Sequence, residues 1–234
     1  VTDANVFNLA IEGTFDDGQQ IVKETFGDLD FKKEYALGAV NSINWARVLA
    51  QVVYYFYAWG QVRKQTGADN VYFSVPTGNF GDIFAGYLAK RMGLPIDQLV
   101  VATNANDILH RCISDNDHSL HDLVHSLSPS MDIMVSSNFE RMLFDLYDRD
   151  GAAINELMSN FKQTGKLALS EPALAKAREL FTSYRLDDEA MIKVIADVWE
   201  NTETIDKTRV LITSTVPLSE ILIDFNDRLK SMTK

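Results

Sequence analysis

Residues Val71 to Gly93 read Val-Tyr-Phe-Ser-Val-Pro-Thr-Gly-Asn-Phe-Gly-Asp-Ile-Phe-Ala-Gly-Tyr-Leu-Ala-Lys-Arg-Met-Gly. A β-type run enters a turn that holds Gly78 and Gly81, and a helical pattern follows at once. This order aims unpaired backbone N–H groups and the positive end of a helix dipole at one point in space. The turn therefore predicts a phosphate-binding site. Glycines that only punctuate a turn are the alternative interpretation.

The turn does not carry either of the two common nucleotide-binding motifs. No Lys-Ser/Thr pair follows Gly81, so it is not a Walker A loop. Gly78 and Gly81 lie three residues apart with no third glycine in place, so the dinucleotide fingerprint is also absent. The phosphate of a compact cofactor fits this turn better than a triphosphate.

Strands and helices alternate in the first part of the sequence, which indicates an α/β protein with a parallel sheet. Expected strands cover residues 5–11, 71–75 and 99–103, and expected helices cover 14–27, 42–64, 80–92 and a segment from 106 onward. Four helices follow at 136–147, 151–163, 171–184 and 187–201, and then a strand at 210–212. We therefore expect an α/β phosphate-binding region over 1–130. The remainder, 131–234, is expected to form a helical flank with a returning strand and a C-terminal helix.

Composition restricts the class of protein. The chain has 234 residues, of which 46% are hydrophobic and 24% charged, and its formal net charge is −11. The negative charge argues against a nucleic-acid partner, and no apolar run is long enough to predict a membrane span. The single cysteine, Cys112, excludes an internal disulfide, and no signal peptide is visible, so we expect a cytoplasmic protein.

Histidine and cysteine patterns predict no metal site. Three of the four histidines, His118, His121 and His125, fall in a polar loop and are expected to be solvated. Cys112 lacks an evident activating base, so we expect a small buried apolar group. The run Ser136-Ser137-Asn138 is expected to act only as a helix cap.

The segment Asn41 to Arg47 places polar residues at the start of an otherwise apolar helix. Capping explains Ser42 but not Asn44 and Arg47, which share a helix face at a spacing of three. Polar groups on a buried helix need partners, and a bound anion is one possible partner. Packing and capping are the alternatives.

Several strings together resemble the threonine synthase family, in its longer bacterial and fungal branch. These strings are Glu12-Gly13-Thr14-Phe15-Asp16-Asp17, Gly38-Ala39-Val40-Asn41-Ser42-Ile43-Asn44-Trp45-Ala46-Arg47, Pro76-Thr77-Gly78-Asn79-Phe80-Gly81-Asp82, Leu127-Ser128-Pro129-Ser130-Met131-Asp132-Ile133 and Ser136-Ser137-Asn138-Phe139-Glu140-Arg141. The resemblance runs from the first residues to about Asn201.

The resemblance implies a three-layer parallel-sheet fold like that of the tryptophan synthase β-subunit, pyridoxal 5′-phosphate (PLP) as cofactor, and conversion of O-phospho-L-homoserine and water to L-threonine and phosphate. Such an enzyme is a PLP-dependent phospho-lyase of threonine biosynthesis. The implied cofactor-binding residues are Thr77, Gly78, Asn79, Phe80, Gly81 and Asp82, chiefly through backbone N–H groups at the phosphate, with Thr213 at the pyridine nitrogen. Candidates for the substrate phosphate are Ser42, Asn44 and Arg47.

The sequence also departs from the family. The family's Schiff-base lysine lies in a region upstream of all these motifs, so no catalytic residue is assigned here, and this chain by itself is expected to be inactive. Two further stretches of the family are expected to be missing, near Asp206/Lys207 and near Ser214/Val216. A non-catalytic threonine-synthase-like protein that binds a phosphorylated ligand is the alternative. The sequence leaves the oligomeric state open.

Overall fold

A computed structural model describes residues 4–13, 15–39, 41–197, 203–204 and 209–213. The chain forms two compact units, Val1–Ala39 and Val40–Lys234. The division expected near residue 130 stays a prediction.

The N-terminal unit contains helices α1 (Phe15–Gly27) and α2 (Leu29–Glu34). α1 confirms the helix expected here, whereas Thr14, expected to cap it, lies outside the described residues. The strand expected over residues 5–11 is wrong, because this segment is not a strand and exposes 79% of Phe7 and 89% of Leu9. An extended segment needs neighbouring strands to satisfy its backbone, and this segment pairs with none of the described strands.

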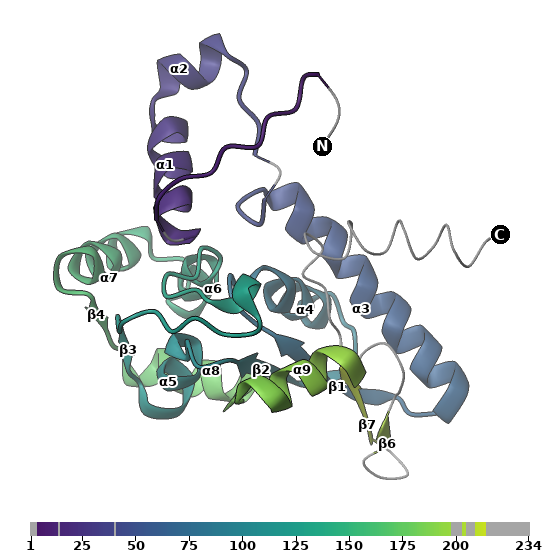
Figure 1. Ribbon diagram of the computed structural model, residues 1–234. Helices are drawn as coiled ribbons and strands as arrows, with labels where there is room; N and C mark the ends of the chain where they lie inside the picture. Colours follow the sequence, from purple (N-terminus) through teal and green to yellow (C-terminus); the bar gives the residue numbers. More distant parts are fainter. Residues whose placement is uncertain (1–3, 14, 40, 198–202, 205–208, 214–234) are drawn as a thin grey trace. The chain divides into compact units, whose positions relative to one another are not determined.

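The larger unit is built on a mainly parallel sheet with the strand order β5-β2-β1-β7-β6 (Figure 1). Its parallel strands are β1 (Asn70–Pro76), β2 (Ile96–Thr103), β5 (Phe181–Arg185) and β7 (Arg209–Thr213), and β6 (Glu203–Thr204) is antiparallel to β7. The α/β class with a parallel sheet is thereby confirmed.

β5 was missed in the sequence, where residues 171–184 were expected to form one helix. The helix α8 (Glu171–Leu180) ends at Leu180 and the chain passes directly into β5. Phe181 lies opposite Leu99 of β2, and pairing continues to Arg185. Strand pairing and burial here override the helical pattern that precedes them.

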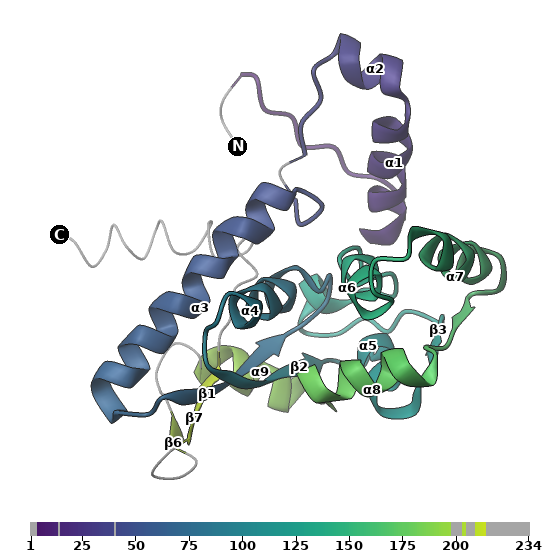
Figure 2. The same cartoon turned by 180° about the vertical axis from the view of Figure 1, so that it is seen from behind.

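The remaining helices are α3 (Trp45–Thr66), α4 (Gly81–Arg91), α5 (Ile108–Asp115), α6 (Phe139–Leu146), α7 (Gly151–Thr164) and α9 (Asp188–Asp197), and a 3₁₀ turn η1 covers Pro129–Met131. A two-residue ribbon pairs β3 (His118–Ser119) with β4 (Lys166–Leu167). Figure 2 shows these elements from behind. Within the described ranges, no helix is both long enough and apolar enough to span a bilayer.

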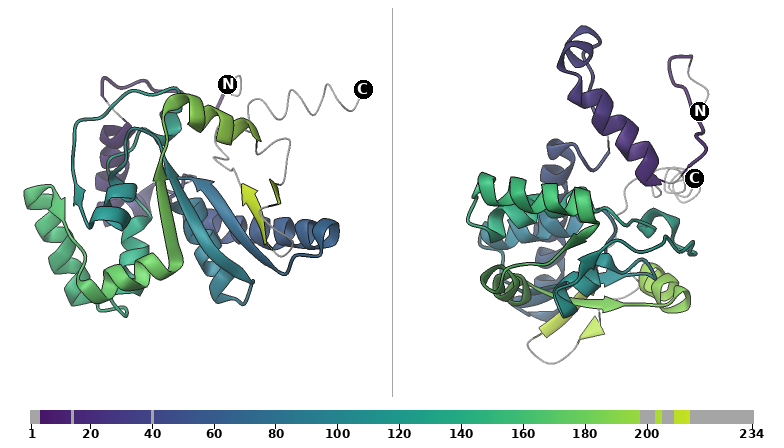
Figure 3. Two further views of the ribbon diagram at one scale, coloured as in Figure 1. Left: turned by 90° about the horizontal axis from the view of Figure 1, so that it is seen from below. Right: turned by 90° about the vertical axis from the view of Figure 1, so that its left-hand side faces the viewer.

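Successive side chains of a strand point to opposite faces of the sheet. Helices cover both of these faces (Figure 3). Phe73 and Leu99 belong to the large core, in which Tyr55 of α3 packs edge-on against Phe73 at 4.7 Å between ring centroids. Ala102, next to Val101 on β2, packs instead with Met191 of α9. Because neighbouring residues of a strand point to opposite faces, α9 covers the face opposite α3.

The parallel strands bring their carboxyl ends to one edge of the sheet. In the chain, β1 is followed by the turn at Gly78 and Gly81, then by α4 and β2. In the sheet, β2 pairs with one edge of β1 and β7 pairs with the other. The strand order therefore reverses between β1 and β7. In open α/β sheets, ligands bind outside the carboxyl ends of the strands at such a switch point.

Candidate functional site

The helix α4 starts without a capping side chain. Phe80 is its N-cap residue and offers no side-chain oxygen to the first N–H groups of the helix. Helical geometry gives those groups no carbonyl partner within the helix. The end of α4 at the switch point is therefore suited to an anion.

Phe80 adopts an unusual backbone conformation, with φ at +62°. Non-glycine residues rarely occupy this left-handed region, which costs about 1–2 kcal/mol. Packing holds the residue there, because its ring is 1% exposed and contacts Phe139 and Phe181 edge-on at 5.3 and 5.5 Å between centroids. The shape of the turn is thus fixed by the core beneath it.

Thr77 is held at the start of the turn by two hydrogen bonds. Its N–H donates to the carbonyl of Ala102 at 2.8 Å, and its hydroxyl donates to the carbonyl of Val75 at 2.6 Å. Both donor groups of Thr77 are therefore used within the protein. The side chain shapes the turn and leaves anion contacts to the residues that follow it.

Asn79 is braced by the segment before α6. Its carbonyl accepts from the backbone N–H of Asn138 at 3.1 Å and from Asn138 Nδ2 at 3.0 Å. Its side-chain Oδ1 accepts from the Ser137 hydroxyl at 3.1 Å. The expectation that Ser136-Ser137-Asn138 only caps a helix is wrong, since Asn138 makes no side-chain cap bond and holds the turn instead.

Both glycines of the turn lie against other parts of the unit. A Cβ on Gly78 would come within 2.9 Å of Ile133 Cδ1 and 3.1 Å of the Ser130 carbonyl. A Cβ on Gly81 would come within 3.2 Å of Asn138 Nδ2 and 3.5 Å of Ser42 Cβ. Gly78 has no room for a side chain, so packing alone explains the glycine there, whereas a Cβ on Gly81 would be tight only against Asn138. At Gly81 the neighbours are two polar residues.

Asp82 lies in the first turn of α4 beside Tyr55. The Tyr55 hydroxyl donates to the Asp82 carbonyl at 2.9 Å. Burial, and secondly the negative charge of Asp82, raise the pKa of Tyr55 well above its usual value, so this phenol stays protonated. A carboxylate repels a phosphate, so Asp82 can serve an anion only through its backbone N–H.

The segment before α3 contains the predicted substrate residues and one correction. Asn44 is the N-cap residue of α3, and its Oδ1 accepts from the Ala46 N–H at 2.9 Å. The expectation that Ser42 caps the helix and Asn44 does not is therefore wrong; the extended backbone of Asn44 (ψ 118°) places the cap two residues later. Ser42 lies next to Gly81, and Arg47 is half-buried in the first turn of α3.

Arg141 joins the two predicted anion sites and was not identified from sequence. Its Nη1 donates to Asn138 Oδ1, its Nη2 donates to the Ile43 carbonyl at 2.7 Å, and its guanidinium lies 5.7 Å from the Trp45 ring centroid. Partial burial lowers the pKa of Arg141. Two signals pointed to it: its place in the resembling string Ser136 to Arg141, and its spacing of three residues after Asn138.

Thr213 ends β7 at the same edge of the sheet. It pairs with Ser74 of β1, and Ser74 precedes Thr77 by three residues in the chain. The predicted cofactor residues thus lie in the turn after β1, in the first turn of α4 and at the end of the adjacent strand β7.

A second polar cluster follows β2 and was also not predicted. Asp132 Oδ1 accepts from Asn104 Nδ2 at 2.8 Å, Asn106 Nδ2 at 2.9 Å and the Ser126 hydroxyl at 2.6 Å. These bonds anchor the loop that leads to η1, and η1 is the segment packed against Gly78. The cluster therefore supports the turn from the side of β2.

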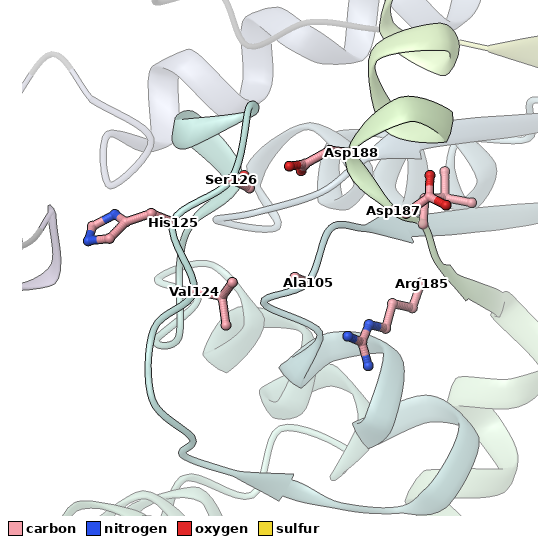
Figure 4. Close-up of a pocket in the computed structure, with 8 residues that line it drawn as sticks. Ala105, Val124, His125, Ser126, Arg185, Asp187 and Asp188 are labelled. Atoms are coloured by element: carbon pink, nitrogen blue, oxygen red, sulfur yellow. The ribbon is translucent and has the colours of Figure 1, made fainter.

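A cavity of about 460 Å³ lies beside this cluster (Figure 4). Its walls include Ala105, Val124, His125, Ser126, Arg185, Leu186, Asp187 and Asp188. Arg185 Nη1 is paired with Asp107 at 3.3 Å, and Asp187 Oδ1 accepts from the Ala190 N–H at 2.8 Å. Arg185 and Asp187 are thus engaged within the protein, and none of the lining residues was predicted as a site residue.

His118 and Cys112 are both buried. The expectation of a solvated His118 is wrong, because the residue is 4% exposed and stacks on Phe139 at 5.1 Å between centroids. Burial lowers the pKa of His118 to about 4. Cys112 is fully buried, as expected, and burial raises its pKa to about 12. Such a thiol is a poor nucleophile.

Known proteins resemble this chain in both sequence and fold. The threonine synthase of Pseudomonas aeruginosa is 57% identical over 199 residues, which are 84% of this chain and 42% of that protein. A crystal structure of PLP-bound threonine synthase from Brucella melitensis has a TM-score of 0.72 and 43% identity, covering 91% of this chain and 50% of that one. The chain belongs to the threonine synthase family.

Members of the threonine synthase family differ in how closely they match. The protein named threonine synthase-like 2 from Xenopus laevis is 37% identical over 86% of this chain and 42% of its own length. The chain spans about 42% of the length of the curated relatives it matches. No family model matches the sequence. The expected PLP fold type II is confirmed by the similarity to the solved threonine synthases.

Proposed function

We propose that this chain is the PLP-phosphate-binding part of a threonine synthase. The complete protein would convert O-phospho-L-homoserine and water to L-threonine and phosphate, the final step of threonine biosynthesis. We place this activity in the cytoplasm, since the single cysteine allows no internal disulfide.

The observation that carries the proposal is the uncapped N-terminus of α4 at the β1/β7 switch point. Its N-cap residue, Phe80, has no polar side chain, and the carbonyl of Asn79 accepts a hydrogen bond from Asn138. The Ser136 hydroxyl, in the segment that braces Asn79, has no hydrogen-bond partner among the described residues although the residue is 8% exposed. A buried hydroxyl without a partner is what a bound phosphate oxygen would satisfy. These features fit the phosphate ester of PLP.

Backbone N–H groups of Gly78, Asn79, Phe80, Gly81 and Asp82 would hold that phosphate, and Thr213 would meet the ring nitrogen. When bound, PLP supplies an electron sink for the substrate carbanion. The chain's own residues fix the cofactor and exclude other orientations. Thr77 and Asn138 act by holding the turn in shape.

Ser42 and Arg47 would bind the phosphate that leaves the substrate. Ser42 lies beside Gly81, so the second anion site adjoins the first. A guanidinium and a hydroxyl stabilise a phosphate by charge-assisted hydrogen bonds. The Oδ1 of Asn44 is used as a helix cap, so its amide Nδ2 would be the group that contacts the anion.

A non-catalytic protein that binds a phosphorylated ligand is the second candidate. The similarity to threonine synthase-like 2 at 37% identity supports it. The higher identity to the P. aeruginosa threonine synthase, 57%, favours the enzyme. Release of one phosphate for each threonine formed by the complete protein would distinguish the two.

Binding of pyridoxine 5′-phosphate to the purified 234-residue chain tests the phosphate site itself. This compound keeps the ring and phosphate of PLP but has no aldehyde, so lysines do not react with it. Gly81→Ala should weaken binding at least about tenfold, equivalent to 1.4 kcal/mol, because its Cβ would lie 3.2 Å from Asn138 Nδ2 and push the Asn138 side chain out of place. Gly151→Ala is the matched control, since a Cβ there meets nothing within 4 Å. Equal affinity in both variants would reject the site.

A further inference from the structure

The helix α3 is apolar on two opposite sides. Its inner side packs in the core through Val48, Val52, Tyr55 and Val62. A second set of apolar residues on the same helix is exposed. We call this set the outer face of α3, and it consists of Trp45, Ala46, Leu49, Ala50, Val53, Phe56 and Tyr57.

The exposure of the outer face is large. Val53 is 63% exposed and Tyr57 is 67% exposed, while Trp45 and Leu49 are 48% and 53% exposed. The spacing of four residues from Trp45 through Leu49 and Val53 to Tyr57 lines these side chains along one side of the helix. They form a continuous stripe over about three turns.

The outer face ends where the exposed positions of α3 become polar. Beyond Gly60 the exposed residues of α3 are Gln61, Arg63, Lys64, Gln65 and Thr66. A solvent-facing side of a helix normally has this second composition, whereas a helix that is apolar all round is buried. The first half of α3 therefore has the composition of a buried helix and the second half that of a surface helix.

The N-terminal unit also exposes apolar side chains. Phe7, Leu9 and Leu29 are 79%, 89% and 72% exposed. A unit of this size buries too little surface to be stable without additional contacts. Exposed apolar side chains are thus present on both units.

The similarity to threonine synthases indicates which part of a larger fold covers the outer face of α3. The chain spans 42% of the P. aeruginosa threonine synthase and 50% of the B. melitensis structure. We propose that the outer face of α3 is the interface to the part of the threonine synthase fold that this chain does not match. The proposal rests on membership of the family and is independent of the proposed activity.

A chimera tests the proposal. In it, this chain replaces its matching part of the P. aeruginosa threonine synthase, so that the unmatched part is present. The variant Leu49→Lys/Val53→Lys puts two charges on the outer face, and Gln61→Lys/Gln65→Lys puts the same charges on exposed polar positions of the same helix. Melting temperature and hydrogen exchange of peptides over 45–57 are measured for the chimera and for the isolated chain.

We expect Leu49→Lys/Val53→Lys to lower the melting temperature of the chimera by more than about 4 °C. In the isolated chain it should change the melting temperature little, because both side chains are already exposed. The control variant should have little effect in either background. Peptides over 45–57 should exchange at least about tenfold more slowly in the chimera than in the isolated chain.

Three results would overturn the proposal. Equal effects of both double variants in the chimera would show that the outer face is not an interface. A concentration-dependent dimer of the isolated chain that Leu49→Lys/Val53→Lys abolishes would assign the face to a second copy. Faster exchange over 45–57 after removal of residues 1–39 from the isolated chain would assign it to the N-terminal unit.

Discussion

Asn138 holds Asn79 with two hydrogen bonds to one carbonyl, from its backbone N–H at 3.1 Å and from Nδ2 at 3.0 Å. The two residues are 59 positions apart in the chain. These two bonds engage the Asn79 carbonyl within the protein. A carbonyl oxygen directed at a phosphate would repel it. By engaging this carbonyl, Asn138 helps to keep the electrostatic potential at the proposed phosphate site positive.

Asn138→Ala removes the side-chain donor to that carbonyl and should weaken pyridoxine 5′-phosphate binding. Because Asn138 is fully buried, we also expect a loss of about 1–3 kcal/mol in the free energy of unfolding. Asn160→Ala makes the same chemical change at an exposed position of α7 and should have little effect. Urea denaturation and equilibrium binding measure both. An unchanged affinity in Asn138→Ala would contradict the role given to this pair.

Arg141→Lys should loosen the segment that carries Ser42. The guanidinium bridges Asn138 and the Ile43 carbonyl, and a single ammonium group cannot reproduce both bonds in this geometry. If the complete protein has the proposed activity, KM for the phosphorylated substrate should rise more than kcat falls, and hydrogen exchange over 41–47 in this chain should be faster. Arg149→Lys, with a side chain 61% exposed, is the control. Unchanged exchange over 41–47 would reject this positioning role.

His118 should make stability depend on pH. Its pKa is about 4 when folded and near 6.5 when unfolded, so below pH 6.5 the unfolded chain binds a proton that the folded chain does not. Stability should therefore fall as the pH falls from about 6.5 to about 4, by about 2 kcal/mol between pH 7 and pH 5. His118→Phe keeps an aromatic ring against Phe139 and should remove this share of the dependence.

The control for this prediction is His125→Phe, which makes the same substitution at an exposed position of the loop. Urea denaturation at pH 7 and pH 5 measures the difference between the variants. The same pH dependence in His118→Phe and in the unmodified chain would show that His118 is not the group responsible.

Gly86→Ala tests the contact between α3 and α4 that supports the site. A Cβ there would lie 2.5 Å from Tyr55 Cε1 and 2.9 Å from Leu99 Cδ2, so the helices must separate. We expect a loss of about 1–3 kcal/mol in unfolding free energy. Gly60→Ala, where a Cβ meets nothing within 4 Å, should instead be neutral or stabilising. Thermal denaturation that ranks the two variants in the opposite order would refute this account of the packing.

Sequence alone predicted the parts of the fold that have local signals. The strands β1, β2 and β7 are apolar runs, and β1 is followed by a glycine-containing turn, so their positions were expected to within a few residues. β5 has no turn residue before it, because Phe181 follows α8 directly. Its strand state depends on pairing with β2, which a local pattern does not contain.

The same distinction applies to the site. The turn at Gly78 and Gly81 was predicted because a strand, glycines and a helix are adjacent in the sequence. The bracing by Asn138 and the bridge from Arg141 to Ile43 were not predicted, because these contacts join positions 59 and 98 residues apart. Burial of His118 was missed for a similar reason, since Phe139 and Phe161 come from distant helices.

A crystal structure of this chain with pyridoxine 5′-phosphate tests the central claim most directly. The account predicts phosphate oxygens within hydrogen-bonding distance of the backbone N–H groups at Gly78 to Asp82, with the ring toward the end of β7. A phosphate bound elsewhere on the chain, such as in the cavity beside Arg185, would contradict it.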